Sequence, residues 1–438
     1  MPAWVDGFGF DMFFMLTWYA VCGIVLVKLK GFQKLTNTDE ALSNWLDAIQ
    51  IKKPKQTAVA LEEALGRVLA EDVVAKDDLP RFDKSAVDGY ALKFEDSIGA
   101  SQFKPAIFQL TENSEIQVNQ AKQVWTGNPI PKGANASVML ENTKKLDGKL
   151  EVWSQLAPGD NISRKGEDVN KGEIAAKAGT RLNPYHIALA AALGYSELQV
   201  YTKPKIAILA TGNELAEVGT TPEGNQIFDS NKIMLSAICR ELGAETIDCG
   251  IAKDNLEEIM EKIKKALQTS DALITTGGTS VGGLDLVPDA VNGIGKPGVI
   301  AHGMALRPAM PTGLAVLEGK PVMILSGNPV AAVVGFEVFG RPAVCRLLGL
   351  SRIEQRPSLK AVMARKVPSA LGRKTYVRVL VTMKNGEFAA EPVSAKGSGA
   401  LSTMTSSNGF VVVPENREGI IEGETVIVYM FSSLEVEM

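Results

Sequence analysis

The feature that most constrains the fold is a short apolar run that leads directly into a glycine-rich turn. Residues 272–274 are Ala-Leu-Ile, which is typical of a buried strand. Glycine then occupies positions 277, 278, 282 and 283 among hydroxyl residues, and an acid follows at Asp285. Glycines allow successive main-chain N–H groups to face one anion, and an acid beside them can bind a metal ion. The stretch predicts a phosphate-binding loop with a metal ligand; a tight turn between a strand and a helix is the alternative.

The same strand-and-turn pattern repeats between residues 205 and 350. Apolar runs that predict strands occur at Ile206–Leu209, Thr246–Cys249, Gly313–Leu317 and Val322–Leu325. Amphipathic spacing predicts helices between several of them, and small polar or acidic residues follow the strands. In open α/β sheets, ligands bind beyond the carboxyl ends of the strands. We therefore expect a doubly wound α/β domain at residues 205–350 with its binding site at that edge.

The rest of the chain divides into regions of different character. Apolar spacing predicts helices at residues 38–46 and 58–69, and Asn183-Pro184 predicts the start of a third that continues through the apolar stretch Ile187–Leu193. We expect them to pack together in a helical linker subdomain made of residues 31–78 plus 170–204. Short alternating runs predict an inserted β-rich subdomain at residues 79–169 and a small C-terminal β-barrel at residues 357–438, with a sandwich as the alternative for the latter. The expected fold class is thus multidomain, α/β and β, around the central α/β domain.

The composition excludes several classes of function. The chain has 438 residues and a formal net charge of −4, which does not suggest a nucleic-acid-binding protein. Its four cysteines form no CxxC pair, which argues against structural zinc and disulfides and is typical of a cytoplasmic protein. Only two histidines occur, so a catalytic triad is hard to build. Chemistry must rely on carboxylates, basic side chains and main-chain amides.

Residues 1–30 differ from everything that follows. The apolar run Phe13–Val27 has 15 residues, fewer than the roughly 20 that a membrane-spanning helix needs. Acids precede it and lysines follow it, which is not the charge order of a secretory signal. A weak membrane anchor, an extra segment and a start codon assigned too early all remain open. We favour the last, because the globular pattern begins only near Leu35.

Six blocks of sequence occur in the order of a known family. They are residues 82–90 (FDKSAVDGY), 159–162 with 166–168 (GDNI, GED), 211–215 (TGNEL), 229–231 (DSN), 276–285 (TGGTSVGGLD) and 325–330 (LSGNPV). Together they resemble the molybdopterin molybdenumtransferase family, which includes MoeA and the E domain of gephyrin. The resemblance covers residues from about 31 to 438 and leaves residues 1–30 without a counterpart.

The resemblance implies an activity and an assembly. The expected reaction is the insertion of molybdate into adenylylated molybdopterin, with Mg²⁺-dependent release of AMP, during molybdenum cofactor biosynthesis. The expected assembly is a homodimer of four-subdomain chains, with an active site shared between subunits. A small-molecule pterin is the expected substrate, other cofactor-biosynthesis enzymes are candidate partners, and no nucleic acid is expected.

The matching positions provide candidate residues for each role. Asp88, Asp168, Glu214 and Asp285 are the candidate catalytic acids, and Glu214 and Asp285 are the candidate metal ligands, because a cation would neutralise charge on the leaving phosphate. Substrate-binding roles are expected for residues that offer main-chain amides, hydroxyls, amides or cations. These are Ser85, Thr211, Asp229, Asn231, Gly277, Gly278, Thr279, Ser280, Gly282, Arg307, Ser326, Gly327, Asn328, Pro329, Arg378, Ser398 and Ser402.

The chain departs from the family pattern where molybdate is expected to bind. The family's Lys-Pro-Gly-Lys-Pro pattern is Arg307-Pro308-Ala309-Met310-Pro311 here, so both lysines and the glycine are replaced. Arg307 keeps a cation with forked donors, whereas Met310 has none. Ser326 stands where the family has proline and adds a hydroxyl. These changes leave open whether the oxyanion is molybdate or tungstate.

Three alternatives to a molybdate-inserting enzyme remain. One is a tungstate-inserting relative. Another is a molybdopterin adenylyltransferase-like enzyme or a nucleotide pyrophosphatase. The blocks at residues 82–90 and 159–168 argue against it, because a lone α/β unit would lack them. The last is a non-catalytic scaffold like gephyrin, against which the four retained acids argue.

Overall fold

The computed structural model describes residues 35–50, 54–278, 286–384, 386–393, 397, 399–432 and 434. The chain forms two compact units. The first unit is Met1–Lys52, Lys203–Leu347 and Ile353–Met438, and the second is Lys53–Thr202 and Leu348–Arg352. Among the described residues, no helix is long and apolar enough to cross a membrane.

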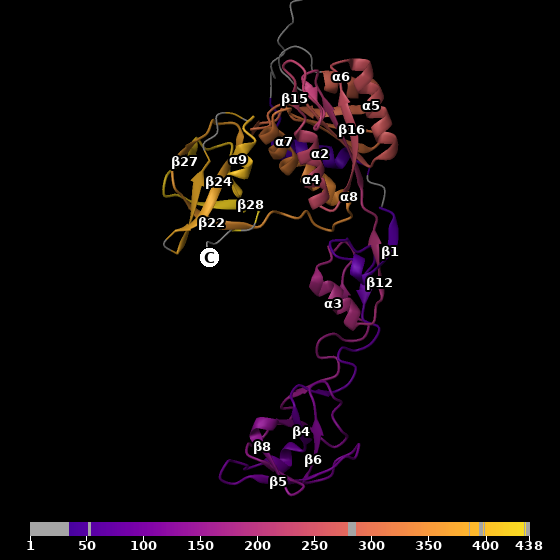
Figure 1. Cartoon of the computed structure of the whole chain (residues 1–438), viewed down its shortest axis with the longest axis vertical. Coiled ribbons are helices and arrows are strands. Elements are labelled where there is room, and N and C mark those ends of the chain that lie inside the picture. Colours follow the sequence, from indigo (N-terminus) through magenta and orange to yellow (C-terminus); the bar gives the residue numbers. More distant parts are fainter. Residues whose placement is uncertain are drawn as a thin grey trace, which may run out of the picture. The chain divides into compact units, whose positions relative to one another are not determined.

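A mixed six-stranded sheet forms the centre of the first unit (Figure 1). Its strand order is β16-β13-β17-β21-β20-β18; the first four strands are parallel, and β20 and β18 are antiparallel to their neighbours. The strands are β13 (Lys205–Thr211), β16 (Glu245–Ala252), β17 (Ala272–Thr276), β18 (Pro297–His302), β20 (Gly313–Leu317) and β21 (Lys320–Leu325). The helices around them are α2 (Thr38–Ala48), α4 (Asn231–Glu241), α5 (Leu256–Thr269), α6 (Leu286–Ile294), α7 (Pro329–Gly335), the π-helical η4 (Phe336–Gly340) and α8 (Arg341–Leu347).

Alternate residues of the central strands pack on opposite layers of helices. Leu209 and Leu273 belong to a buried cluster with Ile259 and Ile263 of α5. Strand residues one position away, such as Ile274, lie against a small space lined by Trp45 and residues of α8. Both faces are therefore covered, which explains why these strands read as continuous apolar runs in the sequence. This sheet confirms the predicted doubly wound α/β domain.

The C-terminal region closes into a five-stranded barrel. Neighbouring strands pair in the order β24-β25-β22-β28-β26, and β26 pairs back with β24, so the ring has no free edge. Its elements are β22 (Ser358–Met363), β23 (Val367–Pro368), β24 (Lys374–Lys384), β25 (Glu387–Pro392), α9 (Ser402–Thr405), β26 (Gly409–Val413), β27 (Gly419–Ile420) and β28 (Thr425–Met430). The predicted barrel is confirmed. β19 (Leu306–Arg307) of the α/β region pairs with the start of β24.

The second unit contains another six-stranded sheet, with strand order β7-β4-β6-β5-β9-β8. Its elements are β1 (Gln56–Ala60), η1 (Leu61–Glu63), β2 (Val73–Val74), β3 (Lys84–Ser85), β4 (Gly89–Leu92), η2 (Phe94–Ser97), β5 (Ala106–Leu110), β6 (Gln120–Val124), β7 (Ala136–Met139), η3 (Leu140–Asn142), β8 (Thr143–Leu146), β9 (Lys149–Val152), β10 (Ile162–Ser163), β11 (Ile174–Ala176), α3 (Pro184–Ala192) and β12 (Glu197–Tyr201). The sheet lies within residues 79–169, where a β-rich region was expected.

The helix expected at residues 58–69 is wrong. Gln56–Ala60 forms β1, which pairs antiparallel with all five residues of β12. Only one 3₁₀ turn follows, Gly66 has a φ of +73°, and Leu65 is 60% exposed. The apolar spacing matched a helix, but pairing with a strand far along the chain overrides local preference.

The packing expected for the first helix is also wrong. α2 lies in the first unit, where it contacts β18 and β20, and not in a helical subdomain with residues 170–204 (Figure 1). The indole of Trp45 is fully buried, and its Nε1 donates a hydrogen bond to the carbonyl oxygen of Ala315 at 2.7 Å. A short apolar helix carries no information about which sheet buries it.

This position gives the first prediction. Trp45→Ala should lower the free energy of unfolding by about 3–5 kcal/mol, because it leaves a cavity and removes the hydrogen bond to Ala315. Phe103, which is 99% exposed, is the control, and Phe103→Ala should change the free energy by less than about 0.5 kcal/mol. Urea unfolding followed by circular dichroism measures both. Equal stability of the two variants would contradict this placement of α2.

Candidate functional site

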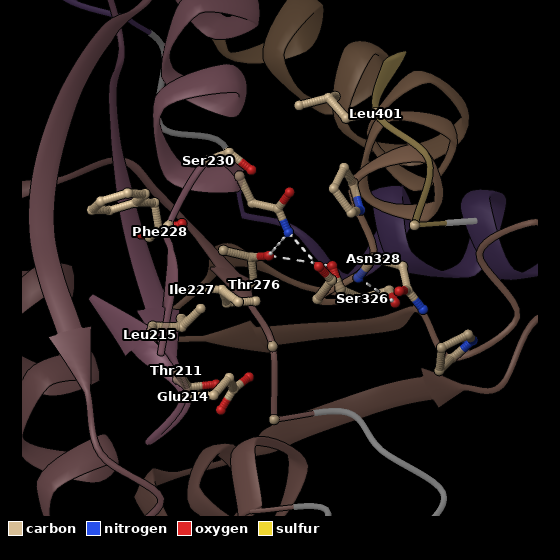
Figure 2. Close-up of a pocket in the computed structure, with 18 residues that line it drawn as sticks. Thr211, Glu214, Leu215, Ile227, Phe228, Ser230, Thr276, Ser326, Asn328 and Leu401 are labelled. Atoms are coloured by element: carbon tan, nitrogen blue, oxygen red, sulfur yellow. Dashed lines mark hydrogen bonds between the residues drawn. The ribbon is translucent and has the colours of Figure 1, made fainter. Parts of the chain in front are cut away.

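A cavity of about 810 Å³ lies at the carboxyl ends of β13, β17 and β21 (Figure 2). Its walls come from the segments that follow these strands, from the start of α4 and from a segment near α9. The lining residues are Thr211, Glu214, Leu215, Ile227, Phe228, Asp229, Ser230, Asn231, Thr276, Gly277, Gly278, Pro311, Ser326, Gly327, Asn328, Pro329, Gly399 and Leu401. Ten residues predicted from the sequence thus share one cavity.

The glycine turn after β17 packs directly on the end of β13. Gly277 has a φ of +92°, and a Cβ there would lie 2.2 Å from the carbonyl oxygen of Thr211. Gly278 has a φ of +65°, and a Cβ there would lie 2.6 Å from Val287 Cγ2. Neither the conformation nor the space admits a larger residue. The two strand ends can therefore meet only because glycine stands at both positions.

The main-chain amides of this turn differ in whether they already have a hydrogen-bond acceptor. The Gly277 N–H donates to the carbonyl oxygen of Leu325 at 3.1 Å, so it extends the strand ladder instead of facing an anion. Within the described residues, the N–H groups of Gly278 and Gly327 have no protein acceptor. These two amides are the described main-chain donors available to a ligand at this end of the cavity.

A hydrogen-bond network ties three of the lining segments together (Figure 2). The Asn231 Nδ2 donates to Thr276 Oγ1 at 3.0 Å and to the carbonyl oxygen of Gly327 at 2.7 Å. Thr276 Oγ1 in turn donates to the carbonyl oxygen of Ser326 at 3.2 Å. Buried side-chain amides that bond several main-chain groups fix the local geometry. Asn231 therefore joins the start of α4 to the ends of β17 and β21.

The described lining carries acids but no bases. Glu214 and Asp229 are its only charged residues. Glu214 is exposed, and its carboxylate lies over Gly212, where a Cβ would be 2.5 Å from Oε2. Among the described residues, no group of three or more His, Cys, Asp or Glu could hold a metal ion by itself. A polyphosphate in this cavity needs a cation, and Mg²⁺ commonly uses one or two carboxylates and completes its ligands with phosphate oxygens and water.

Three buried polar atoms of lining residues have no hydrogen-bond partner among the described residues. They are Thr211 Oγ1, Asp229 Oδ2 and Asn231 Oδ1. Asp229 Oδ2 lies 3.9 Å from the ammonium nitrogen of Lys232. A buried acceptor without a hydrogen bond is costly.

Asp229 is 3% exposed, and burial raises the pKa of its carboxyl group above the usual value. The main-chain N–H and the ammonium group of Lys232 oppose this change. The N–H donates to Asp229 Oδ1 at 3.1 Å. A single neighbouring lysine therefore stabilises the charged form of this carboxylate.

A second cavity of about 300 Å³ contains Arg378 and shares Leu401 with the main cavity. Arg378 lies on β24, opposite Phe410. Its Nε atom is buried without a hydrogen-bond partner among the described residues, and desolvation lowers the pKa of its guanidinium group. An arginine in this environment favours an anionic ligand.

Other predicted residues lie elsewhere. Arg307 is exposed on β19, and Ser402 is exposed at the start of α9; neither lines the main cavity. Ala309 in the same loop as Arg307 has a φ of +88°, a conformation that favours the glycine of the family pattern. Thr279, Ser280, Gly282, Asp285 and Ser398 lie outside the described residues.

Three predicted residues belong to the second unit. Asp88 and Asp168 are exposed, whereas Ser85 is fully buried and its hydroxyl donates to the carbonyl oxygen of Val87 at 2.7 Å. The two motif blocks that carry them are adjacent, because β3 pairs with β10 and Lys165 N–H donates to Asp83 Oδ1 at 2.8 Å. Ser85 thus shapes the turn before Asp88.

The sequence reasoning missed Thr126. Both its main-chain N–H and its hydroxyl donate to Asp88 Oδ1 at 2.8 Å. The N–H and then the hydroxyl of Thr126 lower the pKa of Asp88, so this carboxylate stays charged. The signal available in the sequence was the Gly127-Asn128-Pro129 turn, which repeats the Gly-Asn-Pro of residues 327–329.

The fit of the glycine turn gives the second prediction. Gly277→Ala should lower the free energy of unfolding by about 1–3 kcal/mol beyond the cost of backbone strain, because its Cβ would push the end of β17 away from Thr211. Gly219 has nearly the same φ, +91°, but no atom within 4 Å of an added Cβ. Gly219→Ala should therefore cost only the backbone strain that the two variants share. Urea unfolding followed by circular dichroism measures both, and equal losses would refute the packing argument.

The match with known families covers nearly the whole described chain. Residues 36–194 match the model "MoeA N-terminal region (domain I and II)", residues 207–346 match "Probable molybdopterin binding domain", and residues 360–431 match "MoeA C-terminal region (domain IV)". These three segments correspond to the second unit with α2, the α/β region and the barrel.

Individual relatives agree with this match. The molybdopterin molybdenumtransferase of Staphylococcus aureus (strain COL) is 35% identical over 384 residues, which are 86% of this chain and 91% of the relative. The crystal structure of the molybdopterin biosynthesis MoeA protein from Pyrococcus horikoshii OT3 is 35% identical with a TM-score of 0.79, and the match covers 91% of this chain and all of that one. The chain therefore belongs to the MoeA family and is a molybdopterin molybdenumtransferase.

Proposed function

We propose that this transferase inserts molybdate into adenylylated molybdopterin and releases AMP, with Mg²⁺ bound at the main cavity. The observation that carries the proposal is the composition of that cavity. The amides of Gly278 and Gly327, which have no acceptor among the described residues, lie at one end, carboxylates lie along the wall, and no described lining residue is basic. Such a site suits a phosphate group only together with a cation.

Glu214 and Asp285 are the proposed metal ligands. Glu214 fits this role, because its exposed carboxylate lines the cavity beside the glycine turn. Asp285 follows that turn by a few residues in the sequence. A bound Mg²⁺ would neutralise charge on the phosphate oxygens of the leaving AMP. The chain itself would orient the phosphate through the amides at the strand ends.

The rest of the cavity suits the pterin part of the substrate. The wall at the start of α4 has the polar side chains of Asp229, Ser230 and Asn231, and the pterin edge donates hydrogen bonds from its ring N–H and amino groups. Leu215, Ile227 and Phe228 add apolar surface in the same wall. The substrate would thus lie with its donors toward α4 and its phosphates toward the glycine turn.

The oxyanion is proposed to bind between the barrel and the main cavity. Arg378 supplies a cation with an unpartnered Nε, and Leu401 links its cavity to the main one. Ser326 lines the main cavity, and Ser398, Ser402 and Arg307 are further candidate ligands. We propose molybdate as the physiological oxyanion, with tungstate as the competitor.

Asp88 and Asp168 are proposed to act from the partner subunit of a homodimer. Thr126 keeps Asp88 charged on the surface of the second unit, where it is available to a cation or a proton-bearing group. We propose that the enzyme works in the cytoplasm, as the scattered cysteines of the sequence favour.

The third prediction tests the proposed reaction. The purified protein, given adenylylated molybdopterin and Mg²⁺, should release AMP only when molybdate is added. Glu214→Gln should slow this release by about 10²-fold, because the cavity loses a charge that stabilises the cation. Glu223→Gln, at an exposed acid outside the cavity, is the control.

Other outcomes would favour the alternatives. AMP release without molybdate would indicate a pyrophosphatase or an adenylyltransferase-like enzyme. Release that tungstate supports better than molybdate would indicate a tungsten enzyme, and no turnover with either oxyanion would indicate a scaffold. Equal rates for the two glutamate variants would remove Glu214 from the metal site.

The fourth prediction concerns the oxyanion. Arg378→Met should raise the molybdate concentration for half-maximal AMP release at least roughly tenfold, because a half-buried cation is lost. Arg307→Met, at an exposed arginine outside both cavities, should have a smaller effect. Initial rates across molybdate concentrations measure both. The reverse order would assign the oxyanion to Arg307.

A further inference from the structure

Lys232 is a lysine whose side chain is only 5% exposed, in the first turn of α4 beside the main cavity. Three carboxylates surround its ammonium group. Asp248 Oδ1 lies at 2.9 Å, Glu217 Oε1 at 3.1 Å and Asp229 Oδ2 at 3.9 Å. A lysine is rarely buried unless it is paired. This one joins a cavity residue to two acids that do not line the cavity.

These contacts connect the cavity wall to the central sheet. Asp248 belongs to β16, and its Oδ1 also accepts the Gly250 N–H at 2.8 Å. Glu217 directly follows the short strand β14 (Leu215–Ala216), which pairs with β15 (Ile227–Phe228). The wall segments that carry Glu214 and Asp229 therefore meet at one ammonium group anchored on β16.

Main-chain hydrogen bonds join the two segments of this wall. The Ile227 N–H donates to the carbonyl oxygen of Glu214 at 2.8 Å, and the Asp229 N–H donates to that of Ala216 at 3.0 Å. A shift of Glu217 would therefore move Glu214, and a shift of Asp229 would move the start of α4. Lys232 is the described cation within salt-bridge distance of both sides of this wall.

We propose that Lys232 is a positioning residue of the transferase, which holds the Asp229 carboxylate and the Glu214 segment in place at the cavity. The inference rests on the proposed function, because it takes the main cavity as the substrate site. Lys232 does not line that cavity. It acts through Asp229 and Glu217 and does not touch the substrate.

The charges around Lys232 explain why a neutral side chain would fail. Burial disfavours the lysine charge, yet the hydrogen bonds to Asp248 and Glu217 raise its pKa above the ordinary value. Without the ammonium group, three carboxylates would face one another. Glu217 and Asp248 are more than half exposed and can be screened by water, whereas Asp229 cannot. Its carboxylate would then turn away or bind a proton.

Arginine is the conservative replacement that should restore the contacts. Lys232 lines a space of about 260 Å³ that shares no lining residue with the main cavity, together with Ser236, Arg240 and Asp248. This space can take the larger guanidinium group, which keeps the positive charge and offers more donors. Lys232→Arg therefore tests charge and hydrogen bonding separately from the exact length of the lysine side chain.

The fifth prediction compares Lys232→Met, Lys232→Arg and Glu217→Gln in the AMP-release assay. Lys232→Met should lower kcat/KM by roughly tenfold to a hundredfold, as loss of an outer partner of a site residue commonly does. Lys232→Arg should keep most of the wild-type kcat/KM, and Glu217→Gln should lower kcat/KM by an amount between those of the two lysine variants. Lys264→Met, at an exposed lysine on α5, is the matched control and should equal wild type.

The pH profile separates positioning from a general loss of stability. Burial raises the pKa of Asp229 and Lys232 lowers it, so removing the ammonium group should raise that pKa further. The acid limb of kcat/KM should then move to higher pH in Lys232→Met and return in Lys232→Arg. The charged or titratable groups that also face this cluster are Glu217, Asp248, Arg240 and Cys249.

A double variant tests whether Lys232 acts through Asp229. Asp229→Asn with Lys232→Met should cost less than the product of the two single losses, because the part of the lysine's effect that runs through Asp229 is already gone in Asp229→Asn. If the two single losses in kcat/KM multiply in the double variant, the inference is overturned. An acid limb of kcat/KM that does not move in a folded Lys232→Met would overturn it as well. If Lys232→Met does not fold, wild-type kcat/KM in Glu217→Gln would overturn it instead. Wild-type protein that fails to release AMP would refute the proposed function, not the role of Lys232.

Discussion

The close contact between the ends of β13 and β17 is the constraint on which the site depends. Gly277 passes so near the carbonyl oxygen of Thr211 that no side chain fits between the two strand ends. Asn231 then binds the end of β17 and the turn after β21 with one side-chain amide. Three loops that are far apart in the sequence therefore share one edge of the sheet. The cavity is the space these loops leave open, and its shape follows from glycine and asparagine at fixed positions.

Charge determines how such a cavity can work. Its described lining has two acids and no base, which is unfavourable for an anionic substrate unless a cation accompanies it. The positive groups nearby serve other purposes: Lys232 is turned toward carboxylates behind the wall, and Arg378 occupies a neighbouring cavity. The proposed function thus assigns the phosphate and its metal ion to the main cavity and the oxyanion to the neighbouring cavity. This separation is consistent with a reaction that breaks one phosphoanhydride bond while an oxyanion enters.

The sequence predicted most strands of the α/β domain, the barrel, and ten residues of the cavity, because buried strands, glycine turns and carboxyl-end residues leave local patterns. It failed where long-range packing decides. Residues 56–60 became a strand through pairing with β12, and α2 joined the α/β sheet through Trp45. The roles of Lys232 and Thr126 were also not predictable, because a lysine in an amphipathic helix and a threonine in a turn look like surface residues. Only their contacts with Asp229 and Asp88 distinguish them.

The central claim is that the amides at the ends of β17 and β21 hold the phosphate of the substrate. A crystal structure of the enzyme with AMP and Mg²⁺ tests this most directly. The account predicts a phosphate oxygen within hydrogen-bond distance of the Gly278 or Gly327 nitrogen, with the metal ion bound to Glu214. A nucleotide bound elsewhere, or one whose phosphate faces the Asp229 wall, would contradict it.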